Sequence, residues 1–323
     1  MNDLPLSICF WDYDRTRPLY DGRIQISGAA PKYSILNPVA AFAKAFSTAE
    51  FDVTELSLAG HIAAVAKGNA AYEGIPVHLS RTFRHSTIYV RADGQIRTPA
   101  DLKGKLIGIP DYDMTAAVIL RGLFRDEYGI APSDMAWRVG PLTTEVPPPT
   151  RSVAGVDIQT LRDATIDQEL VSGTLDAIIT VHAPPSFVAR DPRIKRLFPD
   201  WRDAEQTYAE RSGQFPIMHI VGIRKSLLRD HPSLSRTLFD AFEQAKQMAI
   251  ADLDITQAPR ITLPWVVAEL AATRQVLGDD FWPYGVRKNK VTLEALLRHS
   301  YEDGLTPRLL SLEDLFAADT LSL

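Results

Sequence analysis

The sequence predicts an α/β fold with largely parallel sheets, arranged as two lobes with a ligand cleft at the hinge. Strand-like apolar runs alternate with segments of helical periodicity, a pattern typical of parallel strands joined by helices. Two blocks of this alternation occupy residues 1–90 and 104–200. Two long extended segments, residues 76–91 and 214–223, are expected to cross between the lobes. In such sheets a ligand binds beyond the carboxyl ends of the strands.

The first block begins with an apolar strand at residues 6–11, which leads into a charged loop. Residues 39–46 have helical spacing, and residues 51–56 form the next apolar strand. A helix over residues 58–67 follows directly, because apolar residues recur there at intervals of a helical turn. Residues 77–90 are rich in β-branched and aromatic residues and are expected to be extended.

The second block repeats this order. Residues 106–109 are a short apolar strand, and residues 115–128 are an amphipathic helix that ends at a glycine. Residues 135–139 and 175–181 are further strands, and the second of these is apolar enough for burial on both faces. Residues 161–171 between them are expected to be helical.

The remainder of the chain changes from extended to helical. Residues 194–198 are short and extended, and residues 215–223, within the second crossing segment, are extended again. Long amphipathic helices are then expected over residues 234–253, 263–277 and 293–301.

Composition limits both the architecture and the function. The chain has 323 residues, of which 46% are hydrophobic, so two domains with packed cores are expected. We place lobe I at residues 1–92 plus 224–323 and lobe II at residues 93–223. The net charge of −5, without a long basic run, argues against nucleic-acid binding.

The sequence also predicts the compartment. No apolar run approaches the roughly 20 residues needed to span a membrane. Residues 1–3 have no positively charged segment, so no secretory signal is expected. Cys9 is the single cysteine, which excludes an intramolecular disulfide. We therefore expect a cytoplasmic protein.

The segment SRTFRHS at residues 80–86 combines two guanidiniums and an imidazole between two apolar runs. Arginine binds carboxylates through a planar fork of donors, and histidine transfers protons near neutral pH. Arg81 and Arg84 are therefore candidate carboxylate ligands, with Arg15 as a third. The alternative interpretation of this segment alone is an exposed edge strand with ordinary surface charges.

Other candidate residues lie at the carboxyl ends of expected strands or in the two crossing segments. His85, His182 and His219 are candidate proton donors or acceptors, and we favour His182 and His219. Glu55 is the carboxyl alternative, or else the ion-pair partner of an arginine. Further candidates for substrate binding are Asp14, Ser57, Thr115 and Tyr284. Thr115 begins a long helix, where it or Asp113 can be the N-cap and where an anion is favoured.

The sequence lacks the motifs of several common classes of enzyme. The sequence contains no glycine-rich phosphate loop, no GxSxG and no GxGxxG. The histidines lack the short-range spacing of a metal site, so no metal is expected.

Six segments together resemble the 4,5-dihydroxyphthalate decarboxylase family. They are DYDRTR (12–17), FDVTELSL (51–58), SRTFRHS (80–86), DLKGKLIGIPDY (101–112), FPIMH (215–219) and WPYG (282–285). The DLKGK sequence is shared with the wider type 2 periplasmic-binding-protein superfamily and specifies only the fold. The resemblance implies a cofactor-independent, non-oxidative decarboxylase that converts 4,5-dihydroxyphthalate to protocatechuate.

The residues fit that chemistry. A hydroxyl para to the departing carboxylate supplies electrons to the ring, an acid protonates the ipso carbon, and carbon dioxide leaves. The expected ligand is thus a small aromatic carboxylate substrate. We also expect the protein to form a homo-oligomer. The alternative function is a solute-binding protein for an aromatic or small carboxylate, which needs the arginines but no proton-transfer group.

Overall fold

The computed structural model describes residues 3–143 and 151–323, which group into two compact units. The first unit comprises Met1–Arg81, Ser212–Glu294 and Leu310–Leu323, and the second comprises Thr82–Arg211 and Ala295–Leu309. The expected lobe boundaries near residues 92 and 223, and the cleft at the hinge, stay predictions.

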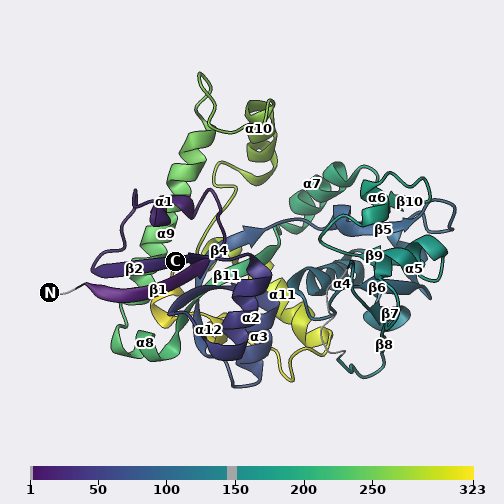
Figure 1. The fold of residues 1–323 in the computed structure, drawn as a ribbon, viewed down its shortest axis with the longest axis horizontal. Coiled ribbons are helices and arrows are strands. Elements are labelled where there is room, and N and C mark those ends of the chain that lie inside the picture. Colours follow the sequence, from purple (N-terminus) through teal and green to yellow (C-terminus); the bar gives the residue numbers. More distant parts are fainter. Residues whose placement is uncertain (1–2, 144–150) are drawn as a thin grey trace. The chain divides into compact units, whose positions relative to one another are not determined.

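The described part of the first unit contains a five-stranded sheet in the order β2-β1-β3-β11-β4 (Figure 1). Its strands are β1 (Leu4–Phe10), β2 (Ala29–Ile35), β3 (Val53–Ser57), β4 (Tyr72–Arg81) and β11 (Ile217–Arg224). β1 is parallel to β2 and β3, whereas β11 is antiparallel to β3 and β4. All strands of this sheet except β11 therefore run in one direction.

Alternation along β1 explains how helices cover both faces of this sheet. Leu6, Ile8 and Phe10 belong to a core that includes Leu238 of α9, whereas Cys9 packs with Ala41 of α2 on the opposite face. The helices in the first unit are α1 (Arg17–Tyr20), α2 (Pro38–Thr48), α3 (Leu58–Ala66), α8 (Lys225–Asp230), α9 (Leu234–Leu253), α10 (Val266–Leu277) and α12 (Leu312–Leu315).

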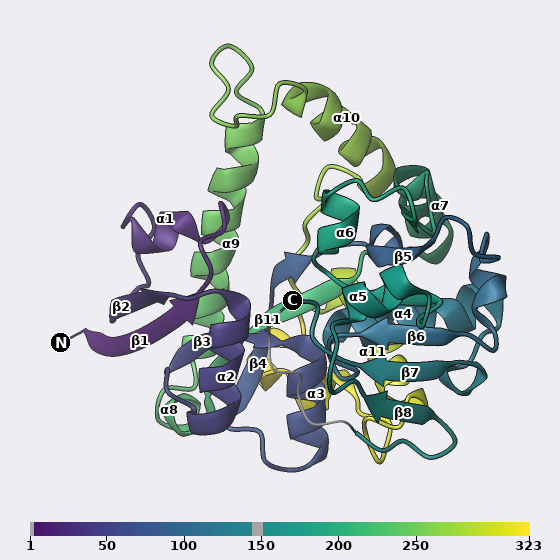
Figure 2. The same ribbon diagram turned by 45° about the vertical axis from the view of Figure 1, so that its right-hand side comes forward.

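The described part of the second unit contains a six-stranded sheet in the order β10-β5-β9-β6-β7-β8 (Figure 2). Its strands are β5 (Ile88–Arg91), β6 (Leu106–Ile109), β7 (Ala136–Val139), β8 (Asp157–Thr160), β9 (Ala177–Ile179) and β10 (Ile194–Arg196). β9, β6, β7 and β8 are parallel, and β5 is antiparallel to both β9 and β10. The prediction of two largely parallel sheets is confirmed.

The second sheet is also covered on both faces. Ile179 packs with Phe124 of α4 in one core, whereas Ile178 packs with Leu170 of α5 in another. The helices here are α4 (Thr115–Tyr128), α5 (Ile166–Ser172), α6 (Pro185–Val188) and α7 (Trp201–Ser212). α11 (Lys290–Glu302) begins in residues assigned to the first unit and ends in those of the second.

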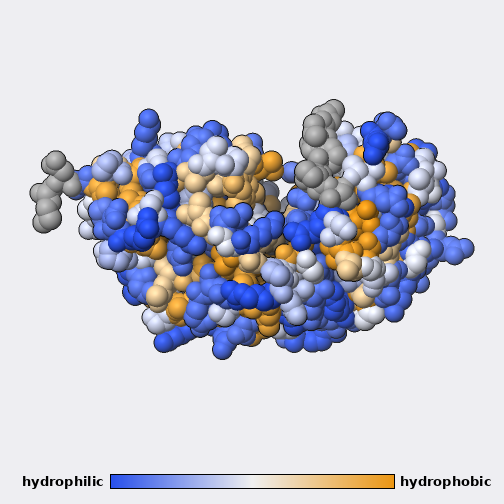
Figure 3. Space-filling model, turned by 90° about the horizontal axis from the view of Figure 1, so that it is seen from below, coloured by the Kyte–Doolittle hydropathy of each residue, from blue (hydrophilic) through white to orange (hydrophobic). Residues whose placement is uncertain are grey.

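The surface carries large apolar side chains as well as charged ones. Figure 3 shows one face, on which hydrophobic residues appear in patches between hydrophilic residues. Val39 and Trp265 are among the exposed large hydrophobic residues. In the part of the chain that the structure describes, no helix is both long and apolar enough to cross a membrane.

Candidate active site

Glu55 is a fully buried carboxylate near the end of β3. Its Oε2 accepts a hydrogen bond from the backbone N–H of Trp11 at 3.1 Å, and its Oε1 accepts one from the Tyr13 hydroxyl at 2.7 Å. The Nδ1 of His219 lies 2.7 Å from the same Oε1. A buried charge needs such partners, because leaving it without hydrogen bonds is costly. The three donors hold this carboxylate in one orientation.

His219 owes its position to an irregularity in β11. The pairing of β11 with β4 shifts register on both sides of His219, so that His219 pairs with Ser80. Such bulges re-aim side chains and are common beside active sites. Because a carboxylate only accepts, Nδ1 carries the proton in this hydrogen bond. The Nε2 atom is then the ring nitrogen left for a substrate.

Tyr13 and Arg15 extend this cluster along the loop that follows β1. Burial, together with the charge of Glu55, raises the pKa of Tyr13 well above its usual value, so the phenol stays a neutral donor. The Arg15 guanidinium lies 4.1 Å from the centre of the Tyr13 ring and 4.4 Å from that of the Trp282 ring. Its Nε donates to the Leu79 carbonyl at 2.8 Å. Arg15 is therefore held by two aromatic faces beside the acid–histidine pair.

Arg81 is buried, and its donors reach backbone and amide oxygens. Its guanidinium donates to the carbonyls of Pro283 and Phe215, at 3.1 and 2.6 Å, and to Oδ1 of Asn289 at 2.7 Å. Burial lowers its pKa to about 9. These contacts join the end of β4 to two distant segments, so Arg81 shapes the loop that carries Trp282.

The other candidates of the first unit occupy different surroundings. Tyr284 is buried in the core, with its ring 4.6 Å from Nζ of Lys246. Asp14 is half-exposed and pairs with Arg15 at 3.1 Å. Ser57 is the N-cap of α3, where its hydroxyl accepts from the N–H of Gly60 at 3.3 Å. Ser57 also lies opposite His219 in the sheet, which brings it near the pair.

Arg84 and His85 lie together in the second unit. Burial lowers the pKa of Arg84 to about 10, and its Nε has no hydrogen-bond partner within the described ranges. Burial also lowers the pKa of His85 to about 4, so its imidazole is neutral at neutral pH. The His85 ring packs on Phe198, with 5.1 Å between the ring centres. Arg84 thus presents an incompletely paired cation, and His85 a neutral ring.

Thr115 and His182 complete the sequence-predicted set. Thr115 is buried as the first residue of α4, but the N-cap is Met114, which corrects the expectation that Asp113 or Thr115 caps the helix. The Asp113 carboxylate instead accepts from Nε of Arg151 at 3.0 Å. His182 is exposed shortly after β9.

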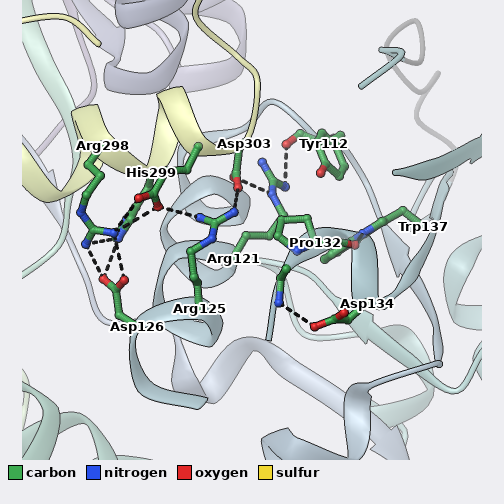
Figure 4. Close-up of polar contacts among 12 residues, drawn as sticks. Tyr112, Arg121, Arg125, Asp126, Pro132, Asp134, Trp137, Arg298, His299 and Asp303 are labelled. Atoms are coloured by element: carbon green, nitrogen blue, oxygen red, sulfur yellow. Dashed lines mark hydrogen bonds and ion pairs between the residues drawn. The ribbon is translucent and has the colours of Figure 1, made fainter. Parts of the chain in front are cut away.

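A buried ion-pair network fixes the start of α4 (Figure 4). Arg121 and Asp303 are both fully buried, and Nε of Arg121 lies 2.7 Å from Oδ2 of Asp303. Nη1 of the same guanidinium donates to the Tyr112 carbonyl at 2.9 Å, and the guanidinium lies 3.8 Å from the centre of the Tyr112 ring. Arg125 adds a second contact to Asp303 at 3.1 Å. The network therefore positions the loop that precedes Thr115.

The candidate residues do not form a cluster of metal ligands. In residues 3–143 and 151–323, no group of three or more His, Cys, Asp or Glu side chains is arranged to hold a metal ion.

Comparison with solved structures identifies the fold class of the chain. The chain resembles a putative sulfonate-binding protein SsuA from Methylobacillus flagellatus, with TM-score 0.59 and 14% identity, covering 100% of this chain and 94% of that one. It also resembles the aliphatic sulphonate binding protein SsuA from Escherichia coli, with TM-score 0.55 and 14% identity, covering 99% of both chains. At these identities the likeness concerns the fold alone. The chain has a type 2 periplasmic-binding-protein-like fold.

Sequence relatives identify the family. No family model matches the chain. The chain is 39% identical over 326 residues to 4,5-dihydroxyphthalate decarboxylase of Comamonas testosteroni, covering 98% of this chain and 97% of that protein. It is 37% identical over 210 residues to the protein of that name in Pseudomonas putida, covering 62% of this chain and 79% of that protein. The chain therefore belongs to the 4,5-dihydroxyphthalate decarboxylase family, whose members are carboxy-lyases.

Two neighbours of Glu55 and His219 are absent from the set of residues that the sequence nominates. Tyr13 lies within the DYDRTR segment, next to the nominated residues Asp14 and Arg15, so the sequence could have indicated Tyr13 as a site residue. Phe42, whose ring packs against His219, gives no such signal. Its helix lies on the face opposite the main core, and periodicity alone does not reveal which side chain of that helix meets the imidazole.

Proposed function

We propose that this chain converts 4,5-dihydroxyphthalate to protocatechuate and carbon dioxide, with His219 and Glu55 as its acid–base pair. Membership of the family supports the reaction. The 2.7 Å contact between His219 Nδ1 and Glu55 Oε1 carries the assignment of the pair. A histidine oriented by a buried carboxylate is a recurrent arrangement for proton transfer.

The substrate supplies its own electrons in this mechanism. The ring hydroxyl para to the departing carboxylate loses its proton to water, and its oxygen donates electron density to the carbon that bears that carboxylate. His219 takes up a proton from solvent on Nε2, which makes it an imidazolium, and transfers that proton to the carbon. The carbon–carbon bond then breaks, its electron pair restores the aromatic ring, and carbon dioxide departs. The oxygen is left as a phenolate and takes up a proton from solvent, so the reaction consumes one proton overall as hydrogen replaces the carboxylate.

Glu55 acts through His219 in this proposal. Its carboxylate keeps the proton on Nδ1, so Nε2 is the atom that exchanges a proton with the substrate. It also stabilises the imidazolium formed before transfer. The neutral Tyr13 hydroxyl and the Trp11 N–H hold the carboxylate in place.

Arg15, beside the acid–base pair in the first unit, is the proposed carboxylate ligand there, and Arg84 is a separate candidate carboxylate ligand in the second unit. Arg84 is desolvated and incompletely paired, which strengthens its attraction for an anion. Arg15 donates from Nε and Nη2 to the Leu79 carbonyl and from Nη1 to Asp14, which leaves one N–H on each terminal nitrogen for a substrate carboxylate. Arg81 has a positioning role in this proposal, because backbone carbonyls already engage both of its terminal nitrogens.

The test is an anaerobic incubation of metal-stripped protein with 4,5-dihydroxyphthalate, in which carbon dioxide and protocatechuate are measured together. Equal release of both supports the proposal. Thermal stabilisation by the compound without turnover would instead favour a solute-binding protein. If the compound is neither turned over nor stabilises the protein, the substrate assignment is rejected.

Two sequence expectations stay predictions. Assembly into a homo-oligomer is checked by the mass of the protein in solution, and cytoplasmic location by fractionation of cells.

A further inference from the structure

Large apolar side chains reach the surface beyond the carboxyl ends of β1 and β2. Trp11 follows β1 and is 40% exposed, Ile35 ends β2 and is 45% exposed, and Val39 in the first turn of α2 is 75% exposed. Phe10 and Ile35 are paired in the sheet, which places Trp11 next to the end of β2. Exposed apolar side chains gathered at the ligand-binding end of a sheet are typical of a binding surface.

The packing of α2 explains why these side chains are left outside the core. Ala41 and Ala45, one helical turn apart, are the buried residues of α2. Val39 and Phe42, three positions apart, occupy a different face of the helix. Because the inward residues are small, the helix packs close to the sheet, and Phe42 stays only partly buried. Core packing therefore does not account for the apolar character of Val39 and Phe42.

This apolar surface adjoins the acid–histidine pair. The Phe42 ring meets the His219 ring edge to face, with 4.8 Å between the centres and 83° between the planes. On the other side, the N–H of Trp11 donates to Glu55 at 3.1 Å. The ring of Phe42 thus contacts His219, and the backbone of Trp11 contacts Glu55.

We propose that Trp11, Val39 and Phe42 form an apolar subsite that takes the aromatic ring of the substrate. This inference rests on the proposed function, because it assigns the ring of that substrate to the same site. Phe42 acts as a specificity residue: its ring contributes apolar area and edge-to-face contact, which carboxylate ligands cannot supply. A planar ring on this surface lies against the His219 imidazole, which fits transfer of a proton to a ring carbon.

The test compares phthalate with maleate. Both present two adjacent carboxylates, but only phthalate adds an aromatic ring. Dissociation constants of both are measured calorimetrically for the wild-type protein, Phe42→Ala, Phe42→Leu and Trp265→Ala. Trp265 is the control, because it is an exposed aromatic residue of the same unit that does not belong to the proposed subsite.

We expect the wild-type protein to bind phthalate more tightly than maleate, by about tenfold. Phe42→Ala should reduce this preference at least about fivefold while leaving maleate binding within about twofold, and Phe42→Leu should fall between them. Trp265→Ala should keep the wild-type preference.

An unchanged preference in Phe42→Ala, or an equal loss for both ligands, would overturn the subsite. This readout does not depend on turnover. If the protein binds phthalate selectively through Phe42 but does not decarboxylate 4,5-dihydroxyphthalate, the subsite stands and the proposed function fails. If the protein turns the substrate over but Phe42→Ala keeps the wild-type preference, the proposed function stands and the subsite fails.

Discussion

The Nδ1 atom of His219 and the Oε1 atom of Glu55 lie 2.7 Å apart in the first unit, with Glu55 fully buried. The two residues come from neighbouring antiparallel strands, β11 and β3, and are separated by 164 positions in the chain. Sheet register therefore brings the pair together, and the bulge in β11 turns the imidazole.

Removing the charge of Glu55 tests its orienting role. Glu55→Gln keeps the size of the side chain but can donate as well as accept, so Nδ1 of His219 is no longer held as the donor. We expect kcat to fall by about 10- to 100-fold with a smaller change in KM. Steady-state kinetics of protocatechuate formation measure this. A rise in KM without a fall in kcat would contradict the role.

Arg84 is expected to contribute binding of a carboxylate. Its pKa, lowered to about 10 by burial, still leaves it cationic at neutral pH. Replacement by alanine should raise KM for the substrate by about 10- to 100-fold, since a charge-assisted hydrogen bond is lost. Arg162→Ala, an exposed arginine of the same unit, is the control and should leave KM unchanged. An equal KM in both variants would show that Arg84 does not bind the substrate.

The ion pair of Arg121 with Asp303 is expected to be important for stability. Both side chains are fully buried, so Asp303→Ala leaves a charge without its partner and should lower the free energy of unfolding by about 3–5 kcal/mol. The exposed pair of Arg236 with Asp240 is the comparison, and Arg236→Ala should cost less than about 1 kcal/mol. Urea unfolding measures both. Similar losses in the two variants would contradict a buried network.

His61 should make stability depend on pH. Burial lowers its pKa from 6.5 to about 4, so the unfolded chain binds a proton in this interval that the folded protein does not. The stabilisation is present above pH 6.5 and is lost as pH falls toward 4, by about 2 kcal/mol between pH 7 and 5. His61→Gln keeps a donor for the Leu315 carbonyl but does not titrate.

Unfolding free energies at pH 7 and pH 5 check this expectation. The difference between the two pH values should be about 2 kcal/mol smaller in His61→Gln than in the wild-type protein. A residual dependence is expected, because burial also lowers the pKa of His78 and His85. If the difference in unfolding free energy between the two pH values is the same in the variant and the wild-type protein, the pKa of His61 is not lowered by folding.

Sequence periodicity predicted the elements with strong apolar patterns. The helices over residues 115–128 and 234–253 are confirmed at both ends, as is the strand over residues 106–109. The strand β2 gave no clear signal because Pro31 and Lys32 interrupt it, as is common at a sheet edge. β8 and α7 were not predicted either. β8 is short and polar, and α7 is dominated by charged and polar residues, so neither has a clear apolar pattern.

The site was predictable only in part. Glu55 follows from the rule that ligands bind at the carboxyl ends of strands, and His219 from its place in the second expected crossing segment, together with their residue types. Their contact depends on the register of β11 against β3, which a single sequence does not specify. Arg81 and Arg84 look alike in SRTFRHS, and only the tertiary structure shows that Arg81 donates from both terminal nitrogens to backbone carbonyls.

The most direct measurement is the rate of protocatechuate formation by His219→Ala, with His231→Ala as a control. His231 is an exposed histidine of the same unit, outside the site. The acid–base role of His219 predicts a loss of about 10²- to 10⁴-fold in kcat for His219→Ala and an unchanged rate for His231→Ala. A correctly folded His219→Ala variant that decarboxylates 4,5-dihydroxyphthalate at the wild-type rate would contradict this account.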